Sequence, residues 1–481
     1  MTTLNPTGAP RTAVDPDRVD PTVRSLAITL IVGGLAVVFD STIVGVALDA
    51  LARDLHAPLA TVQWVSTAYL LAVFVTVPLA GWAQSRIGGR RLWVSALGVF
   101  LLGSVLSALA RDAGALIAFR VVQGLAGGIM MPLMATLLVQ AAGGRNIGKV
   151  MAVITVPTAL GPILGPVLGG LILHLADWRW LFLVNIPFCV VGGWLALRNL
   201  PDDRPAPGAP APRLDVVGLL LLGPGCVALV QGLSRIGGGA GPGGAGALIP
   251  LVGGPVLIAA FAVRALRRRS GPALVDVRLL SRRTVAASAT LLLLGGLALF
   301  GSMMLLPLYF QQVRGEDALG AGLLLIPQGV GALIARGVAG RCTDRFGPRA
   351  VALVAFAAVA ATTVPFAFVT ATSSELLLMA ALFARGIALG AAMIAPMGAA
   401  YTGLGHREIP DASIITRLAQ QLGGAVGVAV LAVLLQHAVG AAGTPAAVAA
   451  GFDTAFGWSV ALTAAAVPLC LLLPRRAAAG A

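Results

Sequence analysis

Long apolar segments separated by short polar segments recur along the whole chain. Fourteen of them are long enough to cross a bilayer, for which a helix needs about 20 residues. They cover approximately residues 25–48, 62–82, 92–110, 113–138, 148–174, 179–200, 214–235, 247–266, 284–310, 319–340, 350–370, 374–401, 411–437 and 454–473. This pattern predicts an all-α integral membrane protein with fourteen transmembrane helices. Because the number is even, we expect both ends of the chain on one side of the membrane.

The basic residues between these segments indicate which side that is. With a cytoplasmic N-terminus, about 24 of the 33 lysines and arginines fall in cytoplasmic segments and five fall outside. The other four, Arg120, Arg336, Arg385 and Arg417, lie within predicted spans. Such an excess follows the positive-inside rule. We therefore expect a multi-pass protein of the cell membrane with cytoplasmic N- and C-termini.

The composition agrees with this interpretation. Of the 481 residues, 58% are hydrophobic and 11% are charged, and the mean hydropathy is +0.93. The net charge of +14 follows from the cytoplasmic excess of arginine and needs no nucleic-acid partner. The four cysteines are scattered and have no metal-ligand spacing. We therefore expect the lipid bilayer as the surroundings, and no metal and no cofactor.

Two short segments after the second and tenth predicted spans are related. Residues 81–90 and 340–349 carry glycines and arginines at the same spacing, 259 positions apart. Arg120 and Arg385 repeat at a similar offset of 265 positions. Matches at nearly one offset indicate two related six-helix units. We expect a disordered cytoplasmic tail (1–24), an N-terminal six-helix bundle (25–200), linkers with two inserted transmembrane helices (201–283), a C-terminal six-helix bundle (284–473) and a cytoplasmic tail (474–481).

These segments resemble the major facilitator superfamily. The duplicated segment is similar to its cytoplasmic-loop signature, and Arg120–Gly128 to its fourth-helix motif. Leu160–Gly170 resembles the fifth-helix motif of proton-driven antiporters. Asp40–Val44 and Trp178–Pro187 resemble signatures of the fourteen-helix drug:proton antiporter family. The resemblance covers about residues 25–473. It implies the major facilitator fold and the export of amphiphilic compounds in exchange for protons.

The resemblance also assigns conformational roles to the motif residues. These residues are Gly81, Ser85, Arg86, Gly88 and Arg90 in the first loop, Gly161, Pro162, Gly165, Pro166 and Gly169 in the fifth span, and Gly340, Asp344, Arg345, Gly347 and Arg349 in the second loop. In the fifth span, prolines remove backbone donors and glycines remove side chains. This favours a bent helix that packs closely on a glycine-rich tenth span and can rock against it.

Three residues depart from the family pattern. Ser85 stands where the loop usually has aspartate, Gly45 where asparagine is common and Asp49 where proline is common. The missing charge at Ser85 is expected to weaken the cytoplasmic lock of the first half, although a serine can still cap a helix N-terminus. The sequence alone does not explain Gly45 or Asp49.

Asp40 is the one acid placed well inside a predicted span. A charge within hydrocarbon is costly and is read as functional by default. Asp40 and Arg120 both lie roughly 10–12 Å from the outer ends of their helices at 1.5 Å per residue. The resemblance implies that both helices line the central cavity, so a direct or water-mediated pair is expected. Asp40 can release a proton and arginine cannot. We therefore expect Asp40 to carry the coupled proton and Arg120 to tune it; the alternative is an ion pair that only holds helices together.

Candidates for a substrate cavity are polar, aromatic and methionine side chains within the spans. Methionines and aromatic rings form adaptable apolar surfaces, although each one singly is more often a packing residue. The candidates are Gln63, Trp64, Tyr69, Gln123, Met130, Met303, Met304, Arg385, Met393 and Gln420, with Met131, Tyr309, Met397 and Gln421 beside them.

Together these features predict a monomeric, proton-coupled antiporter that exports amphiphilic drugs or toxic compounds, with a cationic substrate as one possibility. The alternative is a dedicated exporter of one endogenous metabolite or antibiotic. We do not expect an enzyme, because the chain has no His-Glu-x-x-His motif and no intramembrane Ser-His or Asp-Asp arrangement. A channel is disfavoured by the absence of repeated polar rings. A single embedded acid also argues against tight binding of dications.

Overall fold

A computed structural model of the 481-residue chain shows an all-helical protein. The structure describes residues 21–141, 161, 164–202, 214–237, 245–267, 276–368, 373–404, 408–439 and 444–475. Within these ranges, 13 helices are long and apolar enough to span a membrane. A shorter apolar helix, Leu164–Leu175, lies where the fifth span is predicted. The predicted all-α fold with fourteen transmembrane helices is confirmed.

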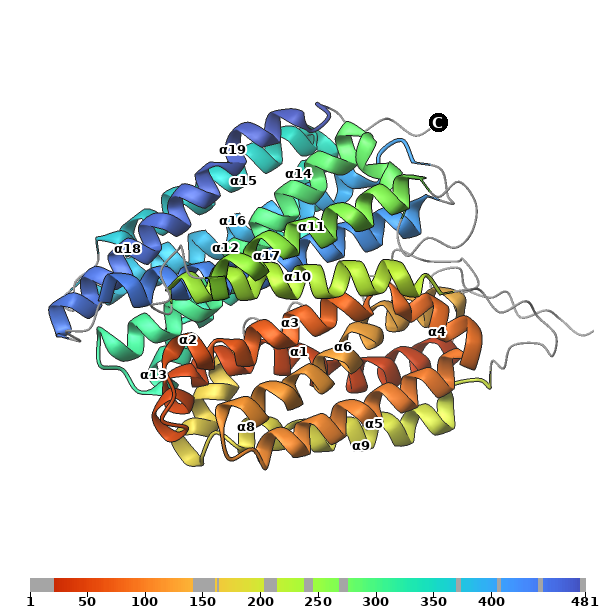
Figure 1. Ribbon diagram of the computed structural model, residues 1–481, viewed down its shortest axis with the longest axis horizontal. Helices are drawn as coiled ribbons and strands as arrows, with labels where there is room; N and C mark the ends of the chain where they lie inside the picture. The colour runs from red at the N-terminus through yellow and green to blue at the C-terminus, as the bar shows by residue number, and fades with distance from the viewer. Residues whose placement is uncertain are drawn as a thin grey trace, which may run out of the picture.

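The first half of the chain forms one helical bundle, drawn in red to yellow in Figure 1. Its helices are α1 (Pro21–Asp54), α2 (Leu59–Val62), α3 (Trp64–Thr76), α4 (Leu79–Ile87), α5 (Gly89–Ala108), α6 (Ala113–Ala141), the helix Leu164–Leu175, α8 (Trp180–Leu183) and α9 (Asn185–Asn199). Helices α2, α3 and α4 together make the second span, and α8 with α9 makes the sixth. Helix α3 packs on α6, and α1 packs on α9.

The second half forms a second bundle, drawn in green to blue. Its elements are η1 (Val277–Ser281), α12 (Arg283–Gln312), α13 (Ala318–Leu324), α14 (Ile326–Phe346), α15 (Pro348–Thr363), η2 (Val364–Ala367), α16 (Glu375–Ala400), α17 (Ile409–Val439), α18 (Pro445–Ala464), α19 (Ala466–Leu469) and η3 (Cys470–Leu472). Helices α10 (Val216–Gly237) and α11 (Ala245–Arg267) pack on each other, and α10 also contacts α3 and α17. The inserted pair therefore lies along the junction between the bundles. The predicted domain boundaries stay predictions.

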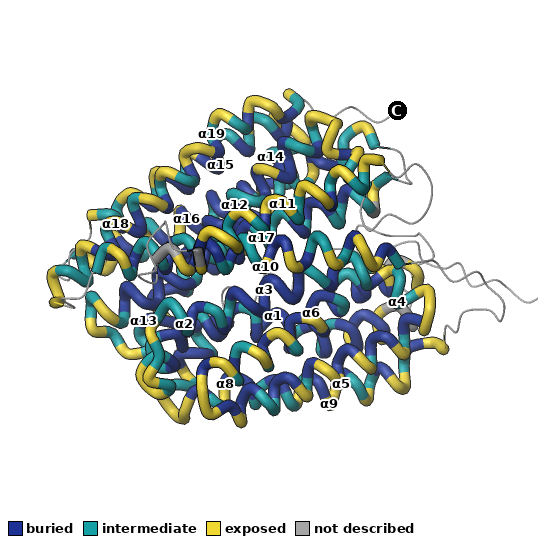
Figure 2. Tube along the Cα trace, in the orientation of Figure 1, coloured by how far each residue is buried: buried dark blue, intermediate teal, exposed yellow. Residues whose placement is uncertain are grey.

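The outer surface of the bundles is apolar. Side chains such as Leu102, Trp194, Ile249 and Val354 are each at least half exposed. Figure 2 shows exposed residues along the outward faces of the helices and buried residues between the helices. A soluble protein rarely exposes so much apolar surface, whereas a bilayer covers it. The core therefore lies between the helices and the lipid-facing surface outside them.

The two glycine-arginine loops share one backbone geometry. Gly88 has φ 86° and ψ 154°, and Gly347 has φ 84° and ψ 153°. Each ends one helix and begins the next, in a left-handed region that favours glycine. This likeness supports the internal repeat. Ser85 does not cap a helix N-terminus, because it lies in the last turn of α4 and its Oγ donates to the Trp82 carbonyl at 2.8 Å.

Hydrogen bonds between the bundles gather at one end, which we call the seam. Gln311 Nε2 donates to the Val46 carbonyl at 3.0 Å, and Gln312 Nε2 donates to Asp49 Oδ1 at 2.8 Å. Nearby, His174 Nδ1 lies 3.1 Å from Asp317 Oδ2. The Gly320 backbone N–H, and then His174, lower the pKa of Asp317 below its usual value. At the other end, which carries Gly88 and Gly347, no hydrogen bond joins a described residue of one bundle to a described residue of the other.

Candidate functional site

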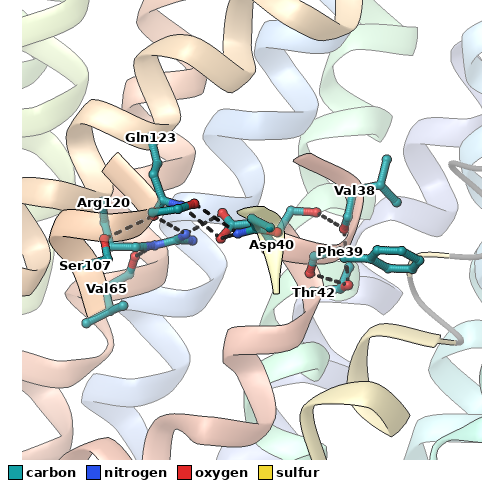
Figure 3. A network of polar contacts seen from close by, with 11 residues as sticks. Val38, Phe39, Asp40, Thr42, Val65, Ser107, Arg120 and Gln123 are labelled. Atoms are coloured by element: carbon teal, nitrogen blue, oxygen red, sulfur yellow. Dashed lines mark hydrogen bonds and ion pairs between the residues drawn. The ribbon is translucent and has the colours of Figure 1, made fainter. Parts of the chain in front are cut away.

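Asp40 and Arg120 form an ion pair inside the N-terminal bundle. Nη1 of Arg120 donates to Oδ2 of Asp40, and the two side chains are 1% and 0% exposed. Asp40 comes from the middle of α1 and Arg120 from α6, so the equal depth expected from the sequence places them together. The pair is drawn at the centre of Figure 3.

The second carboxylate oxygen of Asp40 is held by two amides. Gln123 Nε2 donates to Oδ1 at 3.2 Å, and Asn185 Nδ2 donates to the same atom at 3.1 Å. Both amides also reach Ser104 Oγ, at 2.7 and 3.2 Å. The carboxylate therefore has partners from α6 and α9 as well as its cation, which a buried charge requires. The sequence analysis assigned no role to Ser104 or Asn185; Asn185 was noticed only as part of a family signature.

Arg120 is held from three further directions. Its Nε donates to the Val65 carbonyl at 3.0 Å, and its Nη1 also reaches Gln123 Oε1 at 3.1 Å. Its Cζ lies 4.1 Å from the centre of the Tyr69 ring. A planar guanidinium suits this combination of stacking and hydrogen bonding, which lysine could not reproduce. Helix α3 and Asp40 together therefore fix the position of the Arg120 guanidinium.

A cavity of about 250 Å³ lies between the two bundles. The residues around it include Ser41, Thr42, Tyr69, Gly127, Met131, Phe300, Met303, Arg336, Arg417, Gln420 and Gln421. Helices α1 and α6 both line it, as expected. Asp40 is not among the lining residues, because consecutive helix positions turn by about 100° and its side chain points into the N-terminal bundle.

A small hollow connects the ion pair with the cavity wall. It measures about 20 Å³, which is room for about one water molecule. Arg120 and Ser66 line it, together with Tyr69 and Met303, which also line the cavity.

The predicted substrate residues separate into four groups. Tyr69, Met303 and Gln420 line the cavity, as do Met131 and Gln421, and Met304 lines the small hollow. Gln123 instead holds Asp40. Trp64 lines a separate hollow of about 430 Å³ beside α10, with Gln231 and Arg235.

The remaining candidates are not among the residues that line the cavity, although Met393 Sδ accepts from the cavity residue Gln420 at 3.7 Å. They are Gln63 beside α3, Met130 in the N-terminal core, Tyr309 in a cluster with Phe452 and Phe456, and Met393 against Gly295. Arg385 is 1% exposed, and its Nε donates to Thr363 Oγ1 at 2.9 Å and its Nη1 to Gln328 Oε1 at 2.8 Å. Cavity roles for these residues stay predictions, because none of them is among the residues that line the cavity in this arrangement.

Two cavity residues were missed. Arg336 of α14 and Arg417 of α17 both line the cavity. The sequence analysis counted them as charges inside predicted spans but gave them no position in the cavity. Their charge was the available signal, since ionisable side chains within spans normally face a bundle interior or a water-filled cavity.

The helix Leu164–Leu175 and the adjoining Gly161 pack on both bundles. A Cβ at Gly165 would overlap Thr42, and one at Gly169 would lie 2.9 Å from the Ile43 carbonyl oxygen. Thr42 Oγ1 donates to the Gly161 carbonyl at 3.1 Å. On another face, a Cβ at Gly322 of α13 would lie 2.5 Å from the Pro166 carbonyl oxygen. The expected close packing with the tenth span is therefore present; Pro162 lies outside the described residues.

The loop motifs are mostly exposed. Gly81, Arg86 and Gly340 are exposed or have open space around them, and Arg86 stacks on Trp82 at 5.7 Å. Arg90 Nη2 donates to the Leu197 carbonyl, and Arg345 stacks on Phe346 at 5.3 Å. Arg349 is partly buried at the start of α15, and Asp344 is exposed, with no ion pair among the described residues. Locking contacts for Asp344 therefore stay a prediction.

The seam explains two of the unusual residues in α1. A Cβ at Gly45 would lie 2.6 Å from the Met303 carbonyl oxygen, so only glycine allows α1 and α12 to approach this closely. Asp49 accepts from Gln312 across the seam and pairs with Arg53 at 2.8 Å. Proline at position 49 would lack both interactions. Gly45 and Asp49 thus favour the arrangement in which the seam is closed.

We expect Gly45→Ala to destabilise this closed seam, because overpacking a close contact costs about 1–3 kcal/mol. Cysteines introduced as Asp49→Cys and Gln312→Cys, in a Cys342→Ser background, should then cross-link about tenfold more slowly than with Gly45 present. Gly98→Ala is the control, since nothing lies within 4 Å of a Cβ at that position. Unchanged cross-linking in Gly45→Ala would contradict this account of the seam.

Known proteins share both the sequence and the arrangement of helices. The chain is 37% identical over 438 residues to a multidrug resistance protein B homolog of Mycobacterium tuberculosis, covering 90% of this chain and 80% of that protein. It is 30% identical to a putative multidrug resistance protein MdtD of Serratia proteamaculans, with 82% of each covered. It is 29% identical to the lincomycin resistance protein LmrB of Bacillus subtilis, covering 85% and 84%.

The fold agrees with these relatives. The crystal structure of the nucleoside transporter NupG superimposes with a TM-score of 0.68, covering 92% of this chain and 99% of that one at 13% identity. At that identity the likeness concerns the fold alone. Residues 30–428 match the family described as Major Facilitator Superfamily. The chain is therefore a multi-pass membrane transporter that belongs to the major facilitator superfamily.

Proposed function

We propose that this protein is a proton-coupled antiporter that exports small amphiphilic compounds across the cell membrane by alternating access. The observation that carries the proposal is the ion pair of Asp40 and Arg120, which is fully buried beside the cavity between the bundles. Relatives named for multidrug and lincomycin resistance support export as the direction. The protein needs no cofactor in this scheme, because the proton gradient supplies the energy.

The closed seam gives the orientation of the carrier. The excess of basic residues supports a cytoplasmic position for the end with Gly88 and Gly347 and for both termini. The seam around Asp49 and Gln312 then faces the exterior. The described arrangement is that of an inward-facing carrier, whose cavity takes up substrate from the cytoplasmic side. Opening the seam and closing the loop end completes the exchange.

The ion pair supplies the coupling. Outside, Asp40 takes up a proton, so its charge is lost and Arg120 loses its counter-ion. The Arg120 guanidinium keeps its contacts with the Tyr69 ring and the Val65 carbonyl, so it can shift without entering lipid. Inside, Asp40 releases the proton and the pair reforms with Gln123 and Asn185. The carrier then returns outward with substrate.

The cavity wall favours a range of substrates over one. Met131, Phe300 and Met303 provide flexible or flat apolar surface, which adapts to ligands of different shape. Export of one endogenous metabolite or antibiotic is the alternative. Growth assays in a pump-deficient host against unrelated dyes and antibiotics decide between them: we expect resistance to several classes, and resistance to one compound alone would favour the dedicated exporter.

Proton antiport is tested directly with purified protein in liposomes that contain a pH indicator. With substrate inside and an acidic exterior, we expect substrate to leave against its gradient while the interior acidifies. Protein-free liposomes control for leakage, and a protonophore should stop the uphill phase. Substrate movement without proton movement would reject antiport in favour of facilitated diffusion.

A further inference from the structure

We propose that the transported compounds carry an anionic group, such as a carboxylate or sulfonate, and that Arg336 and Arg417 bind it in the cavity between the bundles. This inference rests on the proposed function, because it names the substrate class of the same cavity. It replaces the cationic substrate considered from the sequence alone.

The cavity is positively charged on the side of the C-terminal bundle. Arg336 from α14 and Arg417 from α17 line it, and no aspartate or glutamate stands among the described lining residues. Arginine stays protonated at any physiological pH. Residues 142–160 and 162–163, outside the described ranges, also contain no acid. The residues that line the cavity therefore include two arginines and, among those described, no acid.

Asp40 does not serve as their counter-ion. It is 0% exposed, points into the N-terminal bundle and is already paired with Arg120. Within the described parts of the chain, Arg417 has neither a hydrogen bond nor an ion pair. Arg385 differs, because Thr363, Gln328 and the Ala298 carbonyl hold it inside the C-terminal bundle. The guanidinium charge of Arg417 is thus available to a ligand.

The rest of the cavity fits the body of a small amphiphile. Gln420 and Gln421 lie one turn from Arg417 on α17 and add neutral hydrogen-bonding groups near the charge. Phe300 and Met131 offer apolar surface. A cationic ligand would add a third positive charge to the cavity, whereas an anionic ligand would neutralise the guanidinium charge of Arg417. Both the repulsion and the attraction are stronger in low-dielectric surroundings than in water.

An anionic substrate also suits exchange for protons. The inside-negative potential of a cell membrane drives an anion outward and a proton inward, so both movements are favoured electrically. The arginines stand on the C-terminal bundle and Asp40 on the N-terminal bundle. Substrate and proton therefore do not share one site, and their exchange is coupled through the movement of the bundles.

The test compares three fluorescent ligands that share one dansyl group: dansylglycine (anionic), dansylglycinamide (neutral) and N-dansyl-ethylenediamine (cationic). Binding to the full-length protein in detergent is followed by dansyl fluorescence at pH 7. We expect the anion to bind at least about tenfold more tightly than the cation, since like-charge juxtaposition is strongly unfavourable. Equal affinities, tighter binding of the cation, or no binding of the anion would overturn the proposal.

Variants then locate the site. Arg417→Gln and Arg336→Gln should each weaken dansylglycine binding about tenfold and change dansylglycinamide binding by less than about twofold, because only the charge is removed. Arg417→Lys should retain part of the preference. Arg283→Gln, an exposed arginine at the start of α12, is the control. An unchanged ratio of anion to neutral affinity in both glutamine variants would reject these arginines as the site, and the ratio is insensitive to partial loss of folded protein.

The same protein in liposomes separates this proposal from the proposed function. Export of dansylglycine without proton movement would leave the anion preference intact and reject antiport. Proton-coupled export of N-dansyl-ethylenediamine in preference to dansylglycine would leave antiport intact and reject the anionic substrate class.

Discussion

Asp40→Asn is expected to abolish export driven by a pH gradient. Asparagine has nearly the same shape as aspartate and can still accept a hydrogen bond from Arg120, but it cannot gain or lose a proton. In liposomes with an acidic exterior, uphill export should therefore fall to the level of protein-free liposomes. Downhill exchange of labelled for unlabelled substrate needs no proton and should persist. This difference separates a loss of coupling from a loss of folding or binding.

Asp112→Asn is the matched control for this variant. Asp112 is exposed before α6, where its Oδ1 accepts from the Ala115 backbone at 2.9 Å, and asparagine can make the same contact. The control should export at the wild-type rate. Uphill export by Asp40→Asn as fast as by wild type would show that Asp40 does not carry the coupled proton. In that case, the buried pair would be a structural ion pair.

Arg120→Met is expected to lower the stability of the protein and stop transport. It leaves the Asp40 carboxylate buried with only the amides of Gln123 and Asn185 as partners. Breaking a buried pair in this way costs about 3–5 kcal/mol, because an uncompensated charge remains. The loss should appear in thermal unfolding at pH 8.

The double variant Asp40→Asn with Arg120→Met provides the critical comparison. It removes both charges, so most of the stability lost in Arg120→Met should return while uphill export stays absent. Arg111→Met, an exposed arginine before α6, controls for the substitution itself. If Arg120→Met unfolds at the wild-type temperature at pH 8, the carboxylate does not depend on this cation.

The sequence by itself determined the membrane class, the fourteen spans and the position of Asp40 inside one of them. These follow from hydropathy and charge, since the bilayer requires long apolar helices and makes each embedded charge conspicuous. The repeated glycine-arginine loops were also recognisable, because a backbone with positive φ restricts the residue type at Gly88 and Gly347. Depth along a helix could be counted from its end, which is why the pairing of Asp40 with Arg120 could be expected.

Only the tertiary structure decided how each helix is turned and what it meets. Met130 and Arg385 face the interior of a bundle, whereas Met131 and Arg417 line the cavity, although hydropathy alone does not distinguish their directions. The presence of glycine at position 45 is explained only by the Met303 carbonyl of α12, which lies against it. Rotating a helix about its axis does not change the length of its hydrophobic segment, so the lipid bilayer does not determine which way the helix is turned. Packing between helices selects it, through contacts between residues that are far apart in the chain.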